Sequence, residues 1–173
     1  MTILVCNPRA ELERFIAERF RKMHGAHISH FCENLLGLRD ERGAWRAAAG
    51  YTPAAGERLF LEQYLDRPIE EALAHAVGTH VARTDIVEVG NLAAVPPGFA
   101  RCFIPALGRY LIDRKYRWVV FTATRQVRNL LDRLCFSAHA LAPAARSRLS
   151  DGGGAAWGTY YANDPTVMAG CIA

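Results

Sequence analysis

Hydrophobic and polar positions in the first third of the chain predict a strand, a helix and a pair of strands. Residues 2–6 form a short apolar run, and Asn7 followed by Pro8 is a typical helix start. Apolar residues then recur at helical spacing up to Gly25, with charged residues on the other face. Residues 35–38 and 45–51 flank a polar turn, which predicts two antiparallel strands.

The middle of the chain alternates between helical and strand-like patterns. A helix is predicted after residues 66–68, and a strand over residues 86–95 is ended by the Pro-Pro-Gly segment 96–98. A further helix begins at that segment, and Pro105 is expected to kink it. The strongest strand is predicted over residues 118–124. Because strands and helices alternate here, we expect a parallel strand pair joined by a crossover.

The C-terminal part predicts one more helix and two short strands. Thr124 is expected to cap a helix whose apolar residues lie on one face. A strand near residues 138–141, a polar segment with glycines at 152–154 and a last strand over residues 157–162 complete the pattern. The chain has no internal repeats, and its 173 residues suffice for one sizeable core. We therefore expect a single domain over residues 1–173.

Composition and charge exclude several classes of protein. The chain is 51% hydrophobic and 22% charged, which is typical of a globular domain. Basic and acidic residues are interspersed and the net charge is only +4, so no nucleic-acid partner is expected. The uncharged stretches fall short of the roughly 20 apolar residues of a membrane-spanning helix. With no secretory signal pattern at its start, the protein is expected to be cytoplasmic, with its five cysteines reduced.

The stretch from residue 86 to residue 141 resembles the GNAT acyltransferase superfamily, in which a strand leads into a Gly-containing loop that holds the acyl carrier's pyrophosphate. Gly98, Phe99 and Ala100 stand at this loop, Arg101 would add a charge-assisted contact, and Asn129 in the later helix is assigned to the same site. The resemblance implies an α/β fold with a mixed central sheet, a splayed parallel strand pair and helices on both faces. The alternative for this loop is an ordinary strand-to-helix turn.

Residues 85–93 are also similar to the acyl-homoserine-lactone synthases, which use acyl carriers with long acyl chains. Glu88 stands where those enzymes keep an acidic residue, whereas Asn91 stands where they keep an arginine. The whole chain resembles the thermostable hemolysin family more closely, through residues 35–40, 59–65, 87–93, 120–124 and 157–161. The family name implies cell lysis, while the implied fold is that of an acyltransferase.

Acyl transfer from a thioester to an amine needs a base and a group that stabilises the developing oxyanion. Glu88 is the best candidate base, because it interrupts an apolar strand where an unpaired carboxylate would be costly. An ion pair between Glu88 and an arginine across the sheet is the alternative. Gly90 suits a β-bulge that would separate the strand from its parallel neighbour. Asn91 and Thr122 are further candidates for the site, with Thr122 and Thr124 sharing one strand face.

Many GNAT enzymes place a tyrosine in the helix after this strand as the acid for the leaving thiolate. Leu131 stands at that position here, so Tyr160, Tyr161 or water would have to replace it. His24, His27 and His30 are evenly spaced but straddle Gly25 and lack further ligands nearby, so we assign no metal.

The leading hypothesis is an acyltransferase that moves a fatty acyl group from coenzyme A or an acyl carrier protein, as acyl-CoA or acyl-phosphopantetheine, to a small amine or amino-acid-like acceptor. A second hypothesis is a membrane-active, lytic factor whose amphipathic first helix makes a peripheral lipid contact. A third is a protein of this fold that binds an acyl carrier without turnover.

Overall fold

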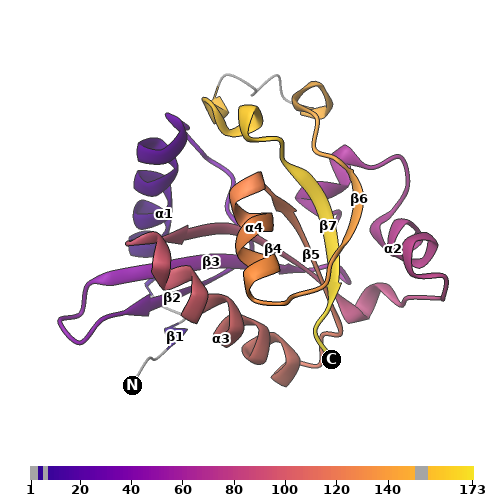
Figure 1. Ribbon diagram of the computed structural model, residues 1–173, viewed down its shortest axis with the longest axis horizontal. Helices are drawn as coiled ribbons and strands as arrows, with labels where there is room; N and C mark the ends of the chain where they lie inside the picture. The colour runs from indigo at the N-terminus through magenta and orange to yellow at the C-terminus, as the bar shows by residue number, and fades with distance from the viewer. Residues whose placement is uncertain (1–3, 6–7, 151–155) are drawn as a thin grey trace.

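The computed structural model describes residues 4–5, 8–150 and 156–173. Within these residues, seven strands form one sheet in the order β1-β2-β3-β4-β5-β7-β6, shown in Figure 1. Only β4 and β5 are parallel among the described strand pairs. The strands are β1 (Leu4–Val5), β2 (Asn34–Arg39), β3 (Trp45–Pro53), β4 (Ile86–Ala94), β5 (Trp118–Ala123), β6 (His139–Pro143) and β7 (Thr166–Cys171).

Helices cover both faces of this sheet. They are α1 (Arg9–His24), α2 (Ile69–Val77), α3 (Ala100–Asp113) and α4 (Arg125–Arg133). Side chains of α3 and α4 form one core with Val87 and Phe121. Side chains of α2 form a second core with Ile86 and Val120, and α1 packs on the same face. Since successive strand residues point to opposite faces, the two cores lie on opposite sides of the sheet. The predicted mixed sheet with helices on both faces is confirmed.

The parallel strands separate at their C-terminal ends, as the sequence resemblance implies. Residues 86–89 of β4 pair with residues 118–121 of β5, after which β4 continues along β3 and β5 continues along β7. A bulge accompanies the separation, because Ala49 of β3 lies opposite both Asn91 and Leu92 of β4. The bulge therefore begins one residue after Gly90, and Asn91 adopts a left-handed conformation with φ of 53°.

The short connecting helices complete the fold, and three of them, η1, η3 and η6, border the site described below. They are η1 (Phe60–Tyr64), η2 (Arg83–Asp85), η3 (Pro97–Phe99), η4 (Arg146–Arg148) and η6 (Tyr160–Asn163). The predicted capping role of Thr124 is confirmed, since its hydroxyl accepts a hydrogen bond from the Val127 N–H of α4. Pro105 lies inside α3, which continues to Asp113. Asn7 and the glycines at 152–154 lie outside the described residues.

The prediction of a last strand over residues 157–162 is wrong. That segment forms turns and η6, and the last strand is β7 instead. Trp157, Tyr160 and Tyr161 pack against one another, so their aromatic spacing reflects a cluster and not an alternating strand. Gly158 has φ of +53°, and a Cβ there would lie 1.9 Å from the His24 carbonyl oxygen. Only a glycine lets the turn approach α1 this closely.

Candidate active site

A cavity of about 1230 Å³ opens where β4 and β5 separate. Its lining is mostly apolar and comes from α1, η1, β4, α3, β5, α4 and the segment around η6. The cavity includes Val89 and Phe121 from the α3/α4 face of the sheet, and Glu88 and Thr122 from the opposite face. It therefore passes between the diverging strands and joins the two faces. Ligand sites in sheets with parallel strands commonly lie at such carboxyl ends.

Glu88 lies on β4 at this opening and is only 6% exposed. Its carboxylate accepts a hydrogen bond from the Leu61 N–H over 3.2 Å, and a second from the Phe60 N–H. Burial raises the pKa of Glu88 to about 7, the negative charge of Glu62 adds to the rise, and the two N–H groups oppose it. No ion pair of Glu88 is found among the described residues. The geometry thus gives no support to an arginine partner across the sheet.

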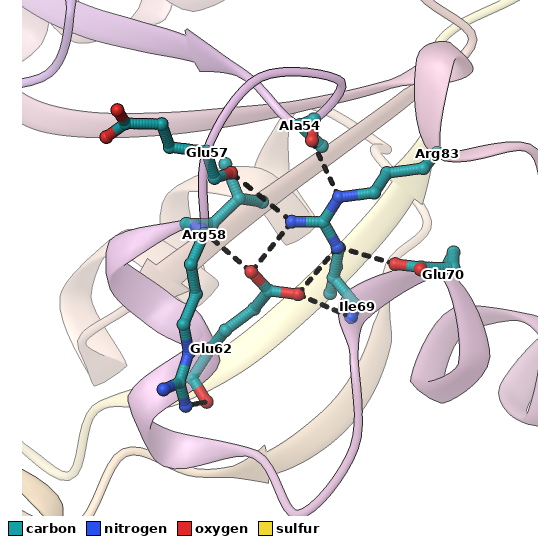
Figure 2. Close-up of polar contacts among 8 residues, drawn as sticks. Ala54, Glu57, Arg58, Glu62, Ile69, Glu70 and Arg83 are labelled. Atoms are coloured by element: carbon teal, nitrogen blue, oxygen red, sulfur yellow. Dashed lines mark hydrogen bonds and ion pairs between the residues drawn. The ribbon is translucent and has the colours of Figure 1, made fainter.

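A second buried acid, Glu62, fixes the helical turn that faces Glu88. Figure 2 shows the Glu62 carboxylate between the Arg83 guanidinium and the backbone of η1 and α2. It accepts hydrogen bonds from the N–H groups of Leu59, at 2.7 Å, and Ile69, at 2.8 Å. Both terminal nitrogens of the Arg83 guanidinium, Nη1 and Nη2, donate to it, at 2.7 and 2.9 Å. Burial opposes ionisation of Glu62, but these partners outweigh it and hold its pKa below the ordinary value.

Arg83 joins this carboxylate to the neighbouring loops. Its Nη1 also donates to Glu70 at 2.6 Å, and its Nε donates to the Ala54 carbonyl oxygen at 2.6 Å. The network thereby holds η1 between β3 and α2, in the position from which Phe60 and Leu61 donate to Glu88. Sequence reasoning missed it, because residues 56–63 show no regular pattern and Arg83 lies 21 residues from Glu62.

Asn91 lines the cavity beside Glu88, with its carboxamide bound to the segment that follows α1. Its Oδ1 accepts a hydrogen bond from the Cys32 N–H at 2.8 Å, and its Nδ2 donates to the His30 carbonyl oxygen at 3.2 Å. Asn91 therefore holds this segment over the bulge. Burial and the nearby Glu88 charge raise the pKa of Cys32 to about 12, so its thiol stays protonated.

Thr122 and Tyr160 both line the cavity. Thr122 is half-buried on β5, two residues after Val120, which lies opposite Glu88 in the register. Burial raises the pKa of Tyr160, and the neighbouring Tyr161 adds to the rise. The Tyr161 hydroxyl is hydrogen-bonded to that of Tyr64. Leu131, at the position where many GNAT enzymes keep a tyrosine, is buried in the core beneath α4.

The residues assigned to the acyl carrier lie at the start of α3, with one exception. Gly98, Ala100 and Arg101 line the cavity, and a Cβ on Gly98 would meet no atom within 4 Å. Phe99 packs against the α3/α4 core, and its N–H bonds to the Pro96 carbonyl oxygen at 3.0 Å. Asn129 is exposed on α4 and is not among the residues that line the cavity. The structure thus brings together the residues at the α3 start and leaves Asn129 apart.

Aromatic residues that sequence reasoning did not assign to the site line its other side. Phe20 of α1, Phe60 of η1 and Trp157 border the cavity together with His24 and His30. Phe60 and Trp157 lie in the segments 59–65 and 157–161 that resemble the thermostable hemolysin family, and His24 and His30 were considered only as metal ligands. The described residues contain no group of three or more His, Cys, Asp or Glu side chains that could hold a metal ion.

Solved structures with similar folds include several acyl-transfer proteins. LasI, an acyl-homoserine-lactone synthase, superposes with a TM-score of 0.65 at 14% identity, over 100% of this chain and 91% of its own. FeeM, an N-acyl amino acid synthase from uncultured soil microbes, gives 0.65 at 12% identity, over 99% of this chain and 89% of its own. MesI, a CoA-dependent acyl-homoserine-lactone synthase, superposes with a TM-score of 0.57 at 14% identity, over 100% of this chain and 89% of its own.

At these identities the structural similarity shows a shared GNAT-like fold. A comparison with curated proteins gave no significant match. The sequence profile described as thermostable hemolysin matches residues 6–173, which is nearly the whole chain. The match includes β4, β5 and every element that borders the cavity. The chain therefore belongs to the thermostable hemolysin family.

Proposed function

We propose that this protein is an acyltransferase that moves an acyl group from a thioester to a primary amine. The observation that carries the proposal is the position of Glu88. Its buried carboxylate, with a pKa of about 7, faces the cavity where β4 and β5 separate. A carboxylate with such a pKa is suited to accept a proton near neutral pH. The similar folds of LasI, FeeM and MesI support the same reaction class.

In the proposed reaction Glu88 removes a proton from the ammonium group of the acceptor, directly or through water. The free amine nitrogen attacks the thioester carbonyl carbon, a C–N bond forms, the attacking nitrogen releases its second proton to solvent, and the C–S bond breaks. Backbone N–H groups of β4 beyond Val89 that point toward β5 have no partner on that strand, and they stabilise the oxyanion. The thiolate leaves without an acid from α4, since Leu131 is apolar, and it takes a proton from Tyr160 or from solvent.

The donor is assigned to the side of the cavity formed by α3 and α4. Gly98, Ala100 and Arg101 line the cavity where η3 leads into α3, and the Arg101 guanidinium supplies a charge for the phosphates of the donor. The cavity volume of about 1230 Å³ and its apolar lining suit a long acyl chain better than an acetyl group. Both acyl-CoA and acyl-phosphopantetheine on a carrier protein present this chemistry.

The structure gives less support to a lytic function. The apolar residues Leu12 and Ile16 of α1 are fully buried against the sheet, so this face is not available to lipid. No helix in the described ranges is long and apolar enough to cross a membrane.

The test is a thiol-release assay with purified protein, acyl-CoA of 2 to 16 carbons, the same acyl groups on a carrier protein, and a panel of primary amines. Amine-dependent release of the thiol, with formation of the amide seen by mass spectrometry, is the expected result. A protein that binds these donors in calorimetry but forms no amide with any amine would be a carrier-binding protein, and the proposal would be wrong.

A further inference from the structure

One side of the cavity is a wall of aromatic rings from four separate segments. We call Phe20, His30, Phe60, Trp157 and Tyr160 the aromatic wall, and all five line the cavity. His30 stacks on Phe60 with centroids 4.4 Å apart, and Phe60 lies 6.1 Å from Trp157. Trp157 lies 5.2 Å from Tyr160 and 6.3 Å from Phe20. The rings therefore form one continuous surface from α1 to η1.

The aromatic wall reaches the proposed base. The Phe60 N–H donates a hydrogen bond to the Glu88 carboxylate. The same residue therefore supplies a ring to the wall and a backbone contact to the base. The wall and Glu88 share the sheet face that carries α1 and α2, opposite the α3/α4 side to which the donor is assigned. Whatever binds on the wall therefore lies next to the base and across the opening from the donor.

The two sides of the cavity differ in charge. On the α3/α4 side, Arg101, Arg109 and Arg133 line the cavity, and all three are exposed. On the wall side, burial lowers the pKa of His24 and of His30, so both imidazoles are neutral at pH 7. Arg19 of α1 is the one arginine or lysine that lines the cavity on this side, within the part of the chain that the structure describes. The donor side, where Asp113 also lines the cavity, thus has a net positive charge, whereas the wall side combines Arg19 with the Glu88 carboxylate.

From this arrangement we infer that the aromatic wall is the acceptor subsite and that the acceptor is an arylalkylamine, a protonated primary amine attached to a flat apolar body. The inference rests on the proposed acyl transfer. Aromatic faces attract an ammonium group and stack against a ring, and Glu88 then receives the ammonium proton. In an α-amino acid the carboxylate is one carbon from the amine. It would therefore lie close to Glu88, and Arg19 is the cation on this side of the cavity that could pair with it.

Binding can be measured without turnover, by calorimetry in the presence of CoA. The probes are 2-phenylethylamine, n-hexylamine, phenylalanine and glycine. We expect 2-phenylethylamine to bind roughly 2- to 12-fold more tightly than n-hexylamine, because its ring stacks on the wall, and phenylalanine to bind more tightly than glycine for the same reason. Equal or tighter binding of n-hexylamine than of 2-phenylethylamine, or of glycine than of phenylalanine, would overturn the inference.

Trp157→Leu tests the wall directly, and Trp45→Leu is its matched control, because Trp45 is a half-buried tryptophan that does not line the cavity. Loss of one aromatic contact of this kind weakens binding by about 0.5–1.5 kcal/mol, so the Kd of 2-phenylethylamine should rise roughly 2- to 12-fold. The Kd of CoA should stay within twofold. The control should leave both values unchanged. If Trp157→Leu instead weakened only the binding of long-chain acyl-CoA, the wall would hold the acyl chain and the inference would be wrong.

Thiol release separates this inference from the proposed function. Selective binding of 2-phenylethylamine with no amide formed would retain the wall as an amine site and overturn acyl transfer. Amide formation with glycine as fast as with 2-phenylethylamine would retain acyl transfer and overturn the acceptor assignment.

Discussion

Glu62 and Glu88, two buried glutamates on either side of the η1 backbone, have opposite pKa shifts. Burial disfavours the charged form of both side chains. Glu62 has the Arg83 guanidinium and two backbone N–H groups, and its pKa falls. Glu88 has backbone N–H groups, and its pKa rises to about 7. The difference makes Glu62 a permanent anion that holds structure, and Glu88 a group that can exchange a proton near neutral pH.

Replacing Glu88 with glutamine keeps the shape of the side chain and removes the base. We expect Glu88→Gln to lower the rate of amide formation by about 10²- to 10⁴-fold, the usual contribution of a general base, with little change in donor Kd. Steady-state kinetics and calorimetry measure the two values. Glu33→Gln, at an exposed glutamate outside the cavity, is the control and should retain full activity. A Glu88→Gln protein with undiminished rate would leave the mechanism without its base.

The pKa of Glu88 also makes stability depend on pH. Its ordinary value is 4.5 and the folded value is about 7, so between these values the folded state binds more protons than the unfolded state. Stability must then fall as pH rises through this window, by up to about 3 kcal/mol in total. Denaturant unfolding at pH 4.5 and pH 8 should show this loss in the parent protein and a smaller one in Glu88→Gln. Equal losses in both proteins would argue that the folded pKa is not raised.

At the scale of an element, η1 owes its position to charges and not to its own helical pattern. It has five residues, too few to be stable alone, and its sequence carries no clear helical period. The Glu62 carboxylate bonds the Leu59 N–H before the turn and the Ile69 N–H after it. Arg83 closes the arrangement from the start of η2. We propose Arg83 as a positioning residue that acts on Glu88 through η1.

Arg83→Met should leave the Glu62 charge uncompensated next to Glu88. The rate–pH profile should then shift to higher pH, because the added negative potential raises the pKa of Glu88 further. Breaking the buried pair should also lower stability by roughly 3–5 kcal/mol. The double variant Glu62→Gln with Arg83→Met removes both charges, and its profile should shift to lower pH. Identical profiles for the single and double variants would contradict an electrostatic route from Glu62 to Glu88.

A control for this pair comes from the surface. Arg148 forms an ion pair with Asp66, which is 86% exposed. Exposed ion pairs contribute about 0–1 kcal/mol to the free energy of unfolding. Asp66→Asn should therefore lower stability by no more than that and should leave the rate–pH profile unchanged.

At the scale of the whole molecule, the separation of β4 and β5 joins two faces of the sheet that carry different chemistry. The α3/α4 side has exposed arginines and a helix start, and the opposite side has Glu88 and the aromatic wall. A reaction between a donor on one side and an acceptor on the other takes place in the opening itself.

A molecule that spans both sides should therefore bind more tightly than either part. A conjugate that joins the sulfur of CoA to 2-phenylethylamine through an acetyl bridge is expected to exceed CoA in affinity by on the order of 10²- to 10⁴-fold. Arg101→Ala and Trp157→Leu should each weaken it, and their effects should add within about 0.5 kcal/mol because they act on separate sides. Calorimetry decides the point, and a conjugate that binds no better than CoA would place both ligands on one side.

Local patterns in the sequence determined most of the elements. The apolar run of β5, the cap at Thr124 and the proline segment after β4 each depend on residues close together in the chain, and each prediction is confirmed. Glu88 stood out because a carboxylate inside an apolar strand is costly. Its burial at the opening between strands is as expected, while its role as a base stays a prediction.

Only the tertiary structure decided what surrounds Glu88. The Phe60 and Leu61 N–H donors, the Arg83 guanidinium and the Trp157 ring come from segments far apart in sequence, and no local period relates them. The same limit explains the wrong last strand. Aromatic residues at 157–162 have high strand propensity, but packing against α1 and η1 outweighs a propensity worth about 1 kcal/mol. The sequence by itself determined most of the strands, the helices and one carboxylate, whereas long-range packing decided that carboxylate's pKa and the aromatic wall beside it.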